Sequence, residues 1–186
     1  MDRAAFLDRD GVINRKAPEG EYITSWEDMH FLPGVAQAVA VLNRDGFKVI
    51  IVSNQRCVAK GLLSISELES MHRRMSDWLL NQGAVIDAIY YCAHEKQPPC
   101  TCRKPSPGML LKAASEHNVD LSASWMIGDS DSDIKAGRNA GCRTVRVQGH
   151  ESVIAVEADI VASSLLEAVD QLVNWENTRA SQGVHK

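Results

Sequence analysis

Two aspartates stand two residues apart at the end of the first apolar run of the sequence. Asp8 and Asp10 follow residues 4–7, and side chains two positions apart in extended backbone project to the same side. Two neighbouring carboxylates need a cation to offset their repulsion, and a hard divalent ion such as Mg2+ does this and also neutralises a phosphoryl group. One carboxylate can then attack phosphorus while the other transfers protons. Taken alone, the pair also fits an exposed acidic turn.

Polar side chains that can hold an anion follow the next two apolar runs. Ser53, Asn54 and Gln55 follow the second run, where a hydroxyl and an amide can hydrogen-bond to phosphate oxygens. Arg103 and Lys104 come after the third run, at a loop-to-helix junction, and offer two positive charges to an anion. Read separately, the first group fits a common turn and the second fits a solvated pair of cations.

A second acidic group follows the fourth apolar run. Asp129 comes directly after it, and Asp133 lies about one helical turn further on. Both residues also fit a helix N-terminus, where acidic side chains favour the positive end of the helix dipole. Four polar groups at the ends of four successive runs are, however, hard to attribute to chance. Together they indicate one site.

Three of the five cysteines crowd together with a histidine. Cys92, His94, Cys100 and Cys102 lie within eleven residues, a spacing typical of metal ligation rather than of disulfides. Such ligands suit a tetrahedral Zn2+, and four protein ligands leave no open position for catalysis. We therefore predict a structural zinc that folds the loop at residues 95–99 and fixes the two cations that follow it. The alternative is a set of buried thiols beside a surface histidine.

Short apolar runs alternate with helical patterns along the chain, and this alternation predicts an α/β fold. The runs are continuous, as in strands buried on both faces, at residues 4–7, 49–52, 88–91, 125–127 and 144–147. Helices are expected between and after them, at residues 35–44, 66–81, 107–117, 131–140 and 165–175. Ser66 with Glu69 predicts a capping box for the second helix, and Ser64 with Glu67 is the alternative. We expect a Rossmann-like parallel sheet with helices on both faces and a ligand crevice at the carboxyl ends of its strands.

Length and composition predict one domain. The 186 residues suit a single domain at residues 1–176, with a frayed tail at 177–186. No apolar run approaches the ~20 residues that cross a bilayer, and a formal charge of -4 offers no basic face for nucleic acid or a membrane surface. Because no signal peptide precedes the first strand and no apolar stripe is left over, we expect a cytoplasmic monomer.

The four polar groups match, in order, the motifs of a known family. The chain resembles the haloacid dehalogenase-like (HAD-like) phosphatases over about residues 4–148, at Asp8-Arg9-Asp10-Gly11, Ser53-Asn54-Gln55, Lys104 and Asp129 to Asp133. Within this family, the Cys/His cluster and the segments 6–14, 102–110 and 126–129 are similar to those of phosphatases of heptose 1,7-bisphosphate, with the histidinol-phosphate phosphatases as close relatives.

The resemblance implies an activity. It is that of a Mg2+-dependent phosphomonoesterase acting on the 7-phosphate of heptose 1,7-bisphosphate, a small phosphorylated sugar. This step belongs to the synthesis of nucleotide-activated heptose for cell-surface glycans such as lipopolysaccharide. Histidinol phosphate or another small sugar phosphate is the alternative substrate.

The resemblance also implies roles for the motif residues. Asp8 attacks phosphorus and becomes an aspartyl phosphate, while Asp10 first protonates the leaving oxygen and then activates water. Ser53 and Asn54 hold the phosphoryl oxygens, joined by the neighbouring Gln55. Because negative charge gathers between the nucleophile and the phosphate, the positively charged lysine of the third motif is expected to offset it.

The same resemblance implies the ligands of the metal. Mg2+ is held by the Asp8 carboxylate, the Asp10 backbone carbonyl and Asp129. Asp133 orients the lysine of the third motif or a metal-bound water. Arg103 contacts the remaining polar or anionic groups of the substrate.

The walls of the pocket are expected to be loops, because the resemblance implies that a large cap domain is absent. The connection at residues 14–33 is too long for an ordinary loop between strand and helix, and we expect it to wall the pocket together with residues 55–63 and the zinc loop. Arg56, and less strongly Lys60, is expected to bind a second phosphate. Ser130 departs from the family pattern, since some relatives have a basic residue there.

A non-catalytic module is the competing hypothesis, either a receiver-like domain phosphorylated on aspartate or a zinc-stapled interaction domain. A receiver usually carries its phosphorylated aspartate after the third strand, whereas Asp8 and Asp10 follow the first. A receiver also has no use for a zinc site. The arrangement therefore favours the enzyme.

Overall fold

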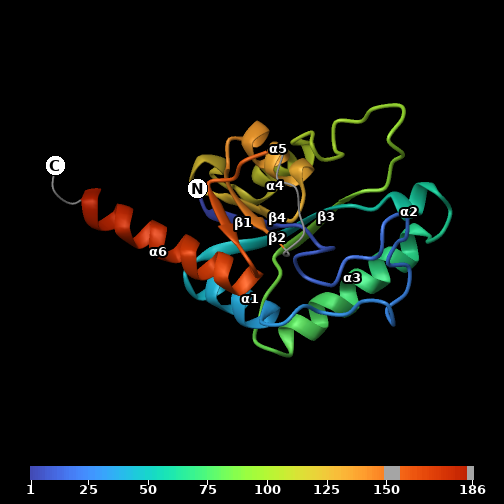
Figure 1. The fold of residues 1–186 in the computed structure, drawn as a ribbon, viewed down its shortest axis with the longest axis horizontal. Helices are drawn as coiled ribbons and strands as arrows, with labels where there is room; N and C mark the ends of the chain where they lie inside the picture. Colours follow the sequence, from blue (N-terminus) through green and yellow to red (C-terminus); the bar gives the residue numbers. More distant parts are fainter. Residues whose placement is uncertain (149–155, 184–186) are drawn as a thin grey trace.

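A parallel sheet forms the centre of the computed structural model, which describes residues 1–148 and 156–183 (Figure 1). The strand order is β3-β2-β1-β4-β5-β6, and each neighbouring pair runs parallel. The first strand is therefore central, with the second and fourth beside it. The strands are β1 (Arg3–Leu7), β2 (Phe47–Asn54), β3 (Ala88–Cys92), β4 (Trp125–Gly128), β5 (Arg143–Val147) and β6 (Ile160–Ala162).

Helices cover both faces of this sheet, as expected (Figure 1). One face is covered by α1 (Val35–Arg44), α3 (Ile65–Leu80) and α6 (Leu165–Gly183). The other is covered by α4 (Gly108–His117) and α5 (Asp131–Ala140). A short helix α2 (Arg56–Ala59) and a 3-10 turn (Leu121–Ala123) complete the elements. Within the described ranges, no helix has the length and apolar character to cross a membrane.

The central strand shows why the apolar runs are continuous. Ala5 and Leu7 pack into the core beneath α1, α3 and α6, whereas Ala4 and Phe6 pack into the core beneath α4 and α5. All four side chains are fully buried, because successive residues of a strand point to opposite faces of a sheet that is covered on both sides. The same arrangement brings the ends of β1, β2, β3 and β4 to one edge, where the polar groups follow.

Two features at the C-terminal end differ from the expectation. The strand β6 was not predicted, because three residues are too short to carry a pattern of their own. The last helix continues to Gly183, beyond the predicted end at residue 175 and through most of the expected tail. The helix runs on because residues 176–182 contain neither proline nor glycine. Residues 184–186 lie outside the described part of the chain.

The start of α3 corrects a second prediction. The capping box is formed by Ser64 and Glu67, not by the preferred pair Ser66 and Glu69. Glu67 N donates to Ser64 Oγ at 3.2 Å, and Ser64 N donates to Glu67 Oε2 at 2.8 Å. The two candidate boxes have the same spacing, so only the point at which the chain enters the helix decides between them.

The long connection between β1 and α1 lies along the carboxyl edge of the sheet. It is anchored at both ends, since Leu32 N donates to Ile13 O at 3.0 Å and the Phe31 ring stacks on Trp78 of α3 at a centroid distance of 3.8 Å. Its residues 16–23 line a cavity at that edge. Among the described residues no separate cap domain covers this edge, in agreement with the expectation.

Ser64→Ala tests the observed cap. We expect the variant to lose about 1 kcal/mol of unfolding free energy, because the Glu67 backbone N–H loses its hydroxyl acceptor. Urea denaturation measures the loss. Ser66→Ala is the matched control and should change the unfolding free energy by less than about 0.5 kcal/mol. The reverse order of the two values would contradict the assignment.

Candidate active site

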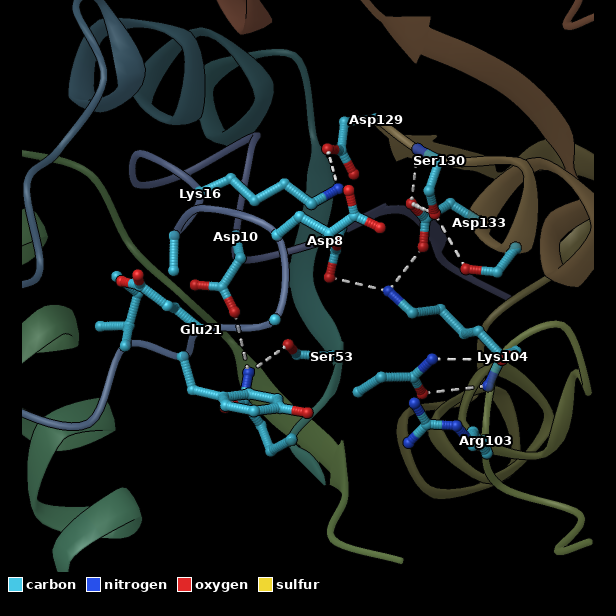
Figure 2. A pocket seen from close by; sticks show the side chains of 18 of the residues that line it. Asp8, Asp10, Lys16, Glu21, Ser53, Arg103, Lys104, Asp129, Ser130 and Asp133 are labelled. Atoms are coloured by element: carbon cyan, nitrogen blue, oxygen red, sulfur yellow. Dashed lines mark hydrogen bonds and ion pairs between the residues drawn. The ribbon is translucent and has the colours of Figure 1, made fainter. Parts of the chain in front are cut away.

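A cavity of about 440 Å3 opens at the carboxyl ends of β1, β2 and β4 (Figure 2). It brings together most of the residues that the sequence singled out, namely Asp8, Asp10, Ser53, Asn54, Gln55, Arg103, Lys104, Asp129 and Asp133. Residues that the sequence reasoning did not single out also line it, among them Lys16, Glu21 and Lys96. The cavity therefore combines a floor of carboxylates with several cations at its wall.

A single buried ammonium group links the motifs. Lys104 Nζ lies 2.7 Å from Asp8 Oδ1, 2.7 Å from Asp133 Oδ1 and 2.7 Å from the backbone oxygen of Val52. The lysine is 3% exposed, so two hydrogen bonds, to Asp8 and Val52, and an ion pair with Asp133 hold its ammonium out of water. Burial disfavours the charged ammonium, but the two carboxylates together raise the pKa of Lys104 above its ordinary value. It is therefore a permanent positive charge beside Asp8.

The backbone around this lysine is held by Asn54 at the end of β2. Asn54 Nδ2 donates to the backbone oxygen of Lys104 at 3.1 Å, and the Lys104 N–H donates to Asn54 Oδ1 at 3.1 Å. Both ends of the carboxamide are thus engaged. The side chain of Asn54 thus fixes the backbone of Lys104, and it also lines the cavity where it was expected to hold the phosphoryl group.

Asp133 is held with similar rigidity at the start of α5. Its Oδ2 accepts hydrogen bonds from the Ser130 N–H at 3.0 Å and from Ser130 Oγ at 2.7 Å, and the residue is fully buried. Gly128 makes room for it, because a Cβ at that position would lie 2.2 Å from the Asp133 Cβ. Asp133 is therefore placed to orient Lys104, which is one of the two roles considered for it.

Asp8 lies in an environment that disfavours its charge. Burial raises the pKa of the Asp8 carboxyl to about 7, the Asp133 and Asp129 carboxylates add to the rise, and the Lys104 ammonium opposes it. Three carboxylates around one buried lysine leave an excess of negative charge. A divalent cation would relieve that excess.

Asp10 has quite different surroundings although it is only two residues away. Its carboxylate receives two hydrogen bonds from Arg9, at 3.0 and 2.9 Å, and one from Asn14 Nδ2 at 2.9 Å. Gln55 Nε2 donates a longer one to Asp10 Oδ2 at 3.2 Å, and also contacts Ser53 Oγ at 2.7 Å. The two aspartates are therefore differentiated, one among acidic groups and the other against a cation.

Arg9 is a functional residue that the sequence reasoning missed. It is fully buried, and its Nη1 lies 3.3 Å from His72 Nε2 of α3. Burial and the adjacent guanidinium lower the pKa of His72 to about 3, so the imidazole is neutral and accepts the hydrogen bond. The position of Arg9 between two motif aspartates was a signal for it, whereas nothing in the pattern of α3 marked His72.

The carboxylates at the cavity floor fit a hard metal ion. Oxygens of Asp8, Asp129 and Asp133 all lie within 4.8 Å of one another. Asp129 Oδ1 is buried without a hydrogen-bond partner, as expected of an oxygen that coordinates an ion. Gly11, with φ of 94°, allows the close approach, because a Cβ there would lie 2.5 Å from Asp129 Oδ2. The Asp10 carboxylate is not a member of this group, in keeping with a role for its backbone carbonyl alone.

Of the two arginines expected to contact the substrate, only Arg103 lies at the cavity wall. Arg103 lines the cavity, and its Nη1 donates to the backbone oxygen of His94 at 3.3 Å. Arg56, which was expected to bind substrate, is not among the lining residues, and its Nε donates instead to Glu95 Oε2 at 2.6 Å. Arg56 thus contacts the loop of the Cys/His cluster rather than the cavity. Lys96 of that loop lines the cavity in its place.

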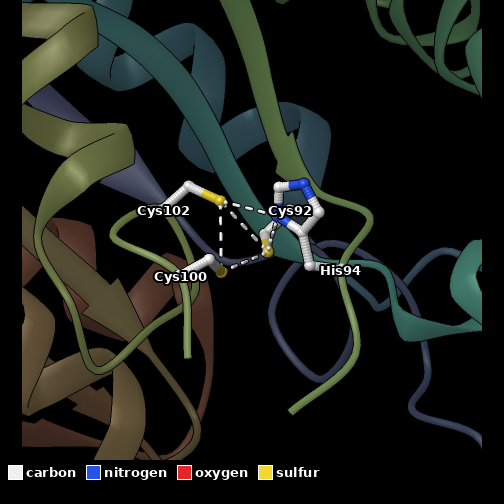
Figure 3. A group of neighbouring side chains, drawn as sticks. All are labelled: Cys92, His94, Cys100 and Cys102. Carbon is white, nitrogen blue, oxygen red and sulfur yellow. Dashed lines mark hydrogen bonds between the residues drawn. The ribbon is translucent and has the colours of Figure 1, made fainter. Parts of the chain in front are cut away.

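The four predicted zinc ligands converge at the end of β3 (Figure 3). The Sγ atoms of Cys92, Cys100 and Cys102 lie 3.3 to 3.6 Å apart, and His94 Nδ1 lies 3.2 Å from Cys102 Sγ. A tetrahedron of Zn–S bonds of about 2.3 Å places its sulfurs about 3.8 Å apart, so the cluster is close to the size that zinc requires. Their donor set and spacing fit a structural Zn2+.

The thiols themselves are unequal without an ion. Burial disfavours the thiolate of Cys100, but hydrogen bonds from Cys102 and from the Arg103 backbone lower its pKa to about 6. Burial and the neighbouring Cys92 sulfur raise the pKa of Cys102 to about 12. The Cys100 thiol therefore ionises readily, whereas ionisation of Cys102 beside other sulfurs is disfavoured. A bound cation would stabilise both thiolates.

The strand order and the positions of the motif residues define a HAD-like hydrolase. An aspartate pair follows the central strand β1, a lysine lies between β3 and α4, and two further aspartates follow β4. A family model described as HAD-hydrolase-like matches residues 101–168. The order in which the motifs meet at one sheet edge agrees with the resemblance seen in the sequence.

Named relatives cover most of the chain. A D-glycero-beta-D-manno-heptose-1,7-bisphosphate 7-phosphatase of Rhodopseudomonas palustris is 39% identical over 165 residues, which is 85% of this chain and 90% of the relative. A D-glycero-D-manno-heptose-1,7-bisphosphate 7-phosphatase of Thermosynechococcus vestitus is 43% identical over 156 residues, 78% of each chain. The crystal structure of D,D-heptose 1,7-bisphosphate phosphatase from B. bronchiseptica, complexed with magnesium and phosphate, matches with a TM-score of 0.83 at 33% identity, covering 92% of this chain and 98% of that one. The chain belongs to the heptose-1,7-bisphosphate 7-phosphatase family of HAD-like phosphatases.

The raised pKa of Asp8 predicts a pH dependence of stability in protein dialysed free of Mg2+. Because the folded-state pKa is raised from 3.8 to about 7, the folded protein keeps a proton that the unfolded chain releases. The contribution of Asp8 to the unfolding free energy should therefore fall as pH rises through this window. The lowered pKa of His72 makes a contribution of opposite sign below pH 6.5, so the fall is read as the difference between the wild type and Asp8→Asn. Urea denaturation at about pH 5 and about pH 8 measures the fall.

Asp8→Asn is the control, because an amide in this place stays neutral at both pH values. We expect this variant to lose less stability than the wild type between the two conditions and to be the more stable protein at the higher pH. Saturating Mg2+ should reduce the fall in the wild type. An equal fall in both proteins would assign the effect to other groups.

Proposed function

We propose that this protein is a Mg2+-dependent phosphomonoesterase that removes the 7-phosphate of D-glycero-D-manno-heptose 1,7-bisphosphate through an aspartyl-phosphate intermediate. The observation that carries the proposal is the buried Lys104 ammonium, 2.7 Å from Asp8 at the floor of the cavity. It provides fixed positive charge where a phosphoryl group and an attacking carboxylate would otherwise repel one another. The substrate follows from the relatives, which are named as phosphatases of this bisphosphate.

In the first step, Asp8 attacks phosphorus. Its Oδ1 accepts a hydrogen bond from Lys104, so Oδ2 is the oxygen that forms the bond to phosphorus. The bond between phosphorus and the O7 oxygen of the sugar breaks, and that oxygen takes a proton from Asp10. We assign the proton to Asp10 Oδ2, whose contact with Gln55 is the longest of the four that hold this carboxylate.

In the second step, water replaces the enzyme at phosphorus. Asp10, now a carboxylate, takes a proton from the water as it attacks, and the bond between Asp8 and phosphorus breaks. Inorganic phosphate leaves and Asp10 is protonated again, so one group acts as acid and then as base. Arg9 and Asn14 hold Asp10 throughout by hydrogen bonds of 2.9 to 3.0 Å.

Mg2+, when bound, neutralises charge on the phosphoryl group. We propose that the Asp8 carboxylate, Asp129 and the Asp10 backbone carbonyl hold it. The unpartnered, buried Asp129 Oδ1 supports this assignment. Asp133 is engaged with Lys104 and Ser130 and therefore acts on the site through them.

The rest of the cavity suits a doubly anionic sugar. Ser53 accepts a hydrogen bond from Gln55, so its own proton is directed to another acceptor, which we take to be a phosphoryl oxygen. We assign the second phosphate to Arg103 rather than to Arg56, because only Arg103 lines the cavity. The side chain of Asn54 contributes by fixing Lys104.

We also propose that Cys92, His94, Cys100 and Cys102 hold a structural Zn2+. The loop they form ends directly before Arg103, so the ion would fix the backbone that carries the cations of the site. The domain at residues 1–176 would act as a monomer in the cytoplasm, as an acidic domain without an apolar stripe suggests. Sedimentation at the mass of one 20.4 kDa chain would support the monomer.

Asp8→Asn should abolish phosphate release. We expect a loss of at least about 10³-fold in kcat/KM, because the nucleophile is removed. Asp10→Asn should lower kcat by about 10²- to 10⁴-fold, as expected for loss of the proton-transfer group. Release of inorganic phosphate from both anomers of heptose 1,7-bisphosphate, in Mg2+, is the measurement.

Histidinol phosphate and simple sugar monophosphates are the comparison substrates. A large preference in kcat/KM for one bisphosphate anomer is the expected result, since a second phosphate adds a contact. Arg103→Met should reduce that preference, and Arg56→Met is its matched control and should not. A preference for histidinol phosphate would contradict the substrate assignment and leave the chemistry in place.

Metal analysis of protein purified without chelator should find one zinc per chain. Cys102→Ala should lower the zinc content and the melting temperature, because a tetrahedral site loses one of four ligands. Cys57→Ala, at a buried cysteine outside the cluster, should keep the zinc. Wild-type protein without zinc would contradict the assignment.

A further inference from the structure

Lys16 places a positive charge directly on the proposed magnesium site. Its Nζ lies 2.6 Å from Asp129 Oδ2, and the Asp8 and Asp133 carboxylates also attract it. Lys16 comes from the connection between β1 and α1, 113 residues away from Asp129 in sequence (Figure 2). No pattern in the sequence marked this contact.

An ammonium on Asp129 Oδ2 opposes the binding of an ion to the free Oδ1 of the same carboxylate. Mg2+ takes carboxylate oxygens at about 2.0–2.1 Å and keeps a full octahedron of ligands around itself. Two cations on one partly buried carboxylate also repel one another. Asp129 has few alternatives, because it is crowded by the Gly11 backbone and its side chain is only 17% exposed.

Lys16 can leave this position with little disturbance. Its side chain is 57% exposed and lies on a surface connection rather than in a helix or strand. Lys16 also lines the substrate cavity, where an anionic ligand would offer its ammonium a new partner. By contrast, Lys104 is buried and has three acceptors, so it stays in place.

We propose that Lys16 competes with Mg2+ for Asp129, and that Mg2+ displaces the Lys16 ammonium into the cavity, where it contacts the anionic substrate. This inference rests on the magnesium site of the proposed function. It implies a coupling between the two ligands: a phosphate that binds Lys16 leaves Asp129 free for Mg2+, and Mg2+ leaves Lys16 free for the phosphate. Lys16 is thus a positioning residue that joins metal loading to substrate binding.

Titration calorimetry of the zinc-loaded, full-length protein with MgCl2 tests the competition. Lys16→Met should bind Mg2+ on the order of fivefold more tightly than the wild type, because the ion no longer displaces an ion pair. Lys16→Arg should stay within about twofold of the wild type, since it keeps a cation of similar reach. Lys96→Met removes a charge from the same cavity wall and is the matched control, with a change below about twofold.

Inorganic phosphate provides the second readout. It should tighten Mg2+ binding in both proteins by direct contact with the ion, and by a larger factor in the wild type than in Lys16→Met. An unchanged or weaker Mg2+ affinity of Lys16→Met would overturn the competition, and so would equal tightening in Lys96→Met. Absence of Mg2+ binding in the wild type and in every variant would overturn the proposed metal site and this inference with it.

Discussion

The buried ion pair between Lys104 and two carboxylates is the constraint on which the site depends. Asp8 follows β1 and Asp133 lies in the first turn of α5, and both meet at one ammonium that water scarcely reaches. Neither carboxylate would be tolerated there as a lone charge, and the lysine would not be either. Because each group requires the others, the ends of β1 and β4 and the loop before α4 are joined at one point. When Asp129 is included, the three carboxylates outnumber the Lys104 ammonium and the cluster keeps a net negative charge. This charge favours the binding of a divalent ion.

Much of the surrounding structure serves to hold that lysine. The Asn54 carboxamide closes two hydrogen bonds on its backbone, and the Ser130 amide and hydroxyl hold Asp133. The Cys/His cluster ends two residues before Lys104, so folding of that loop and placement of the ammonium are coupled. No separate cap domain is present among the described residues, and the residues that line the cavity come from strand ends, from the connection after β1 and from the loop of the Cys/His cluster.

The two motif aspartates illustrate how environment separates roles. Asp8 is surrounded by acidic groups and opposed by one lysine, while Asp10 is held by Arg9 and reaches a partly open wall of the cavity. Arg9 in turn is buried against a neutral His72, so a cation shielded from solvent positions Asp10, which we propose as the acid-base group. Identical side chains two residues apart thus receive different chemistry from their neighbours.

Local pattern determined the elements and most of the motif residues. The apolar runs predicted β1 to β5 and their alternation with helices, since a parallel sheet covered on both faces leaves a clear periodic signal. Because the carboxyl ends of parallel strands meet at one edge, the same pattern predicts that the aspartates, Ser53 and Lys104 lie together. Only the tertiary structure decided which side chains pair at that edge. The side chain of Asn54 contacts the Lys104 backbone and that of Arg56 contacts Glu95. Lys16 and His72 contact the site as side chains that no local signal marked individually. Periodicity records the burial of each face, whereas the partner of a polar group depends on atoms that the fold brings in from distant parts of the chain.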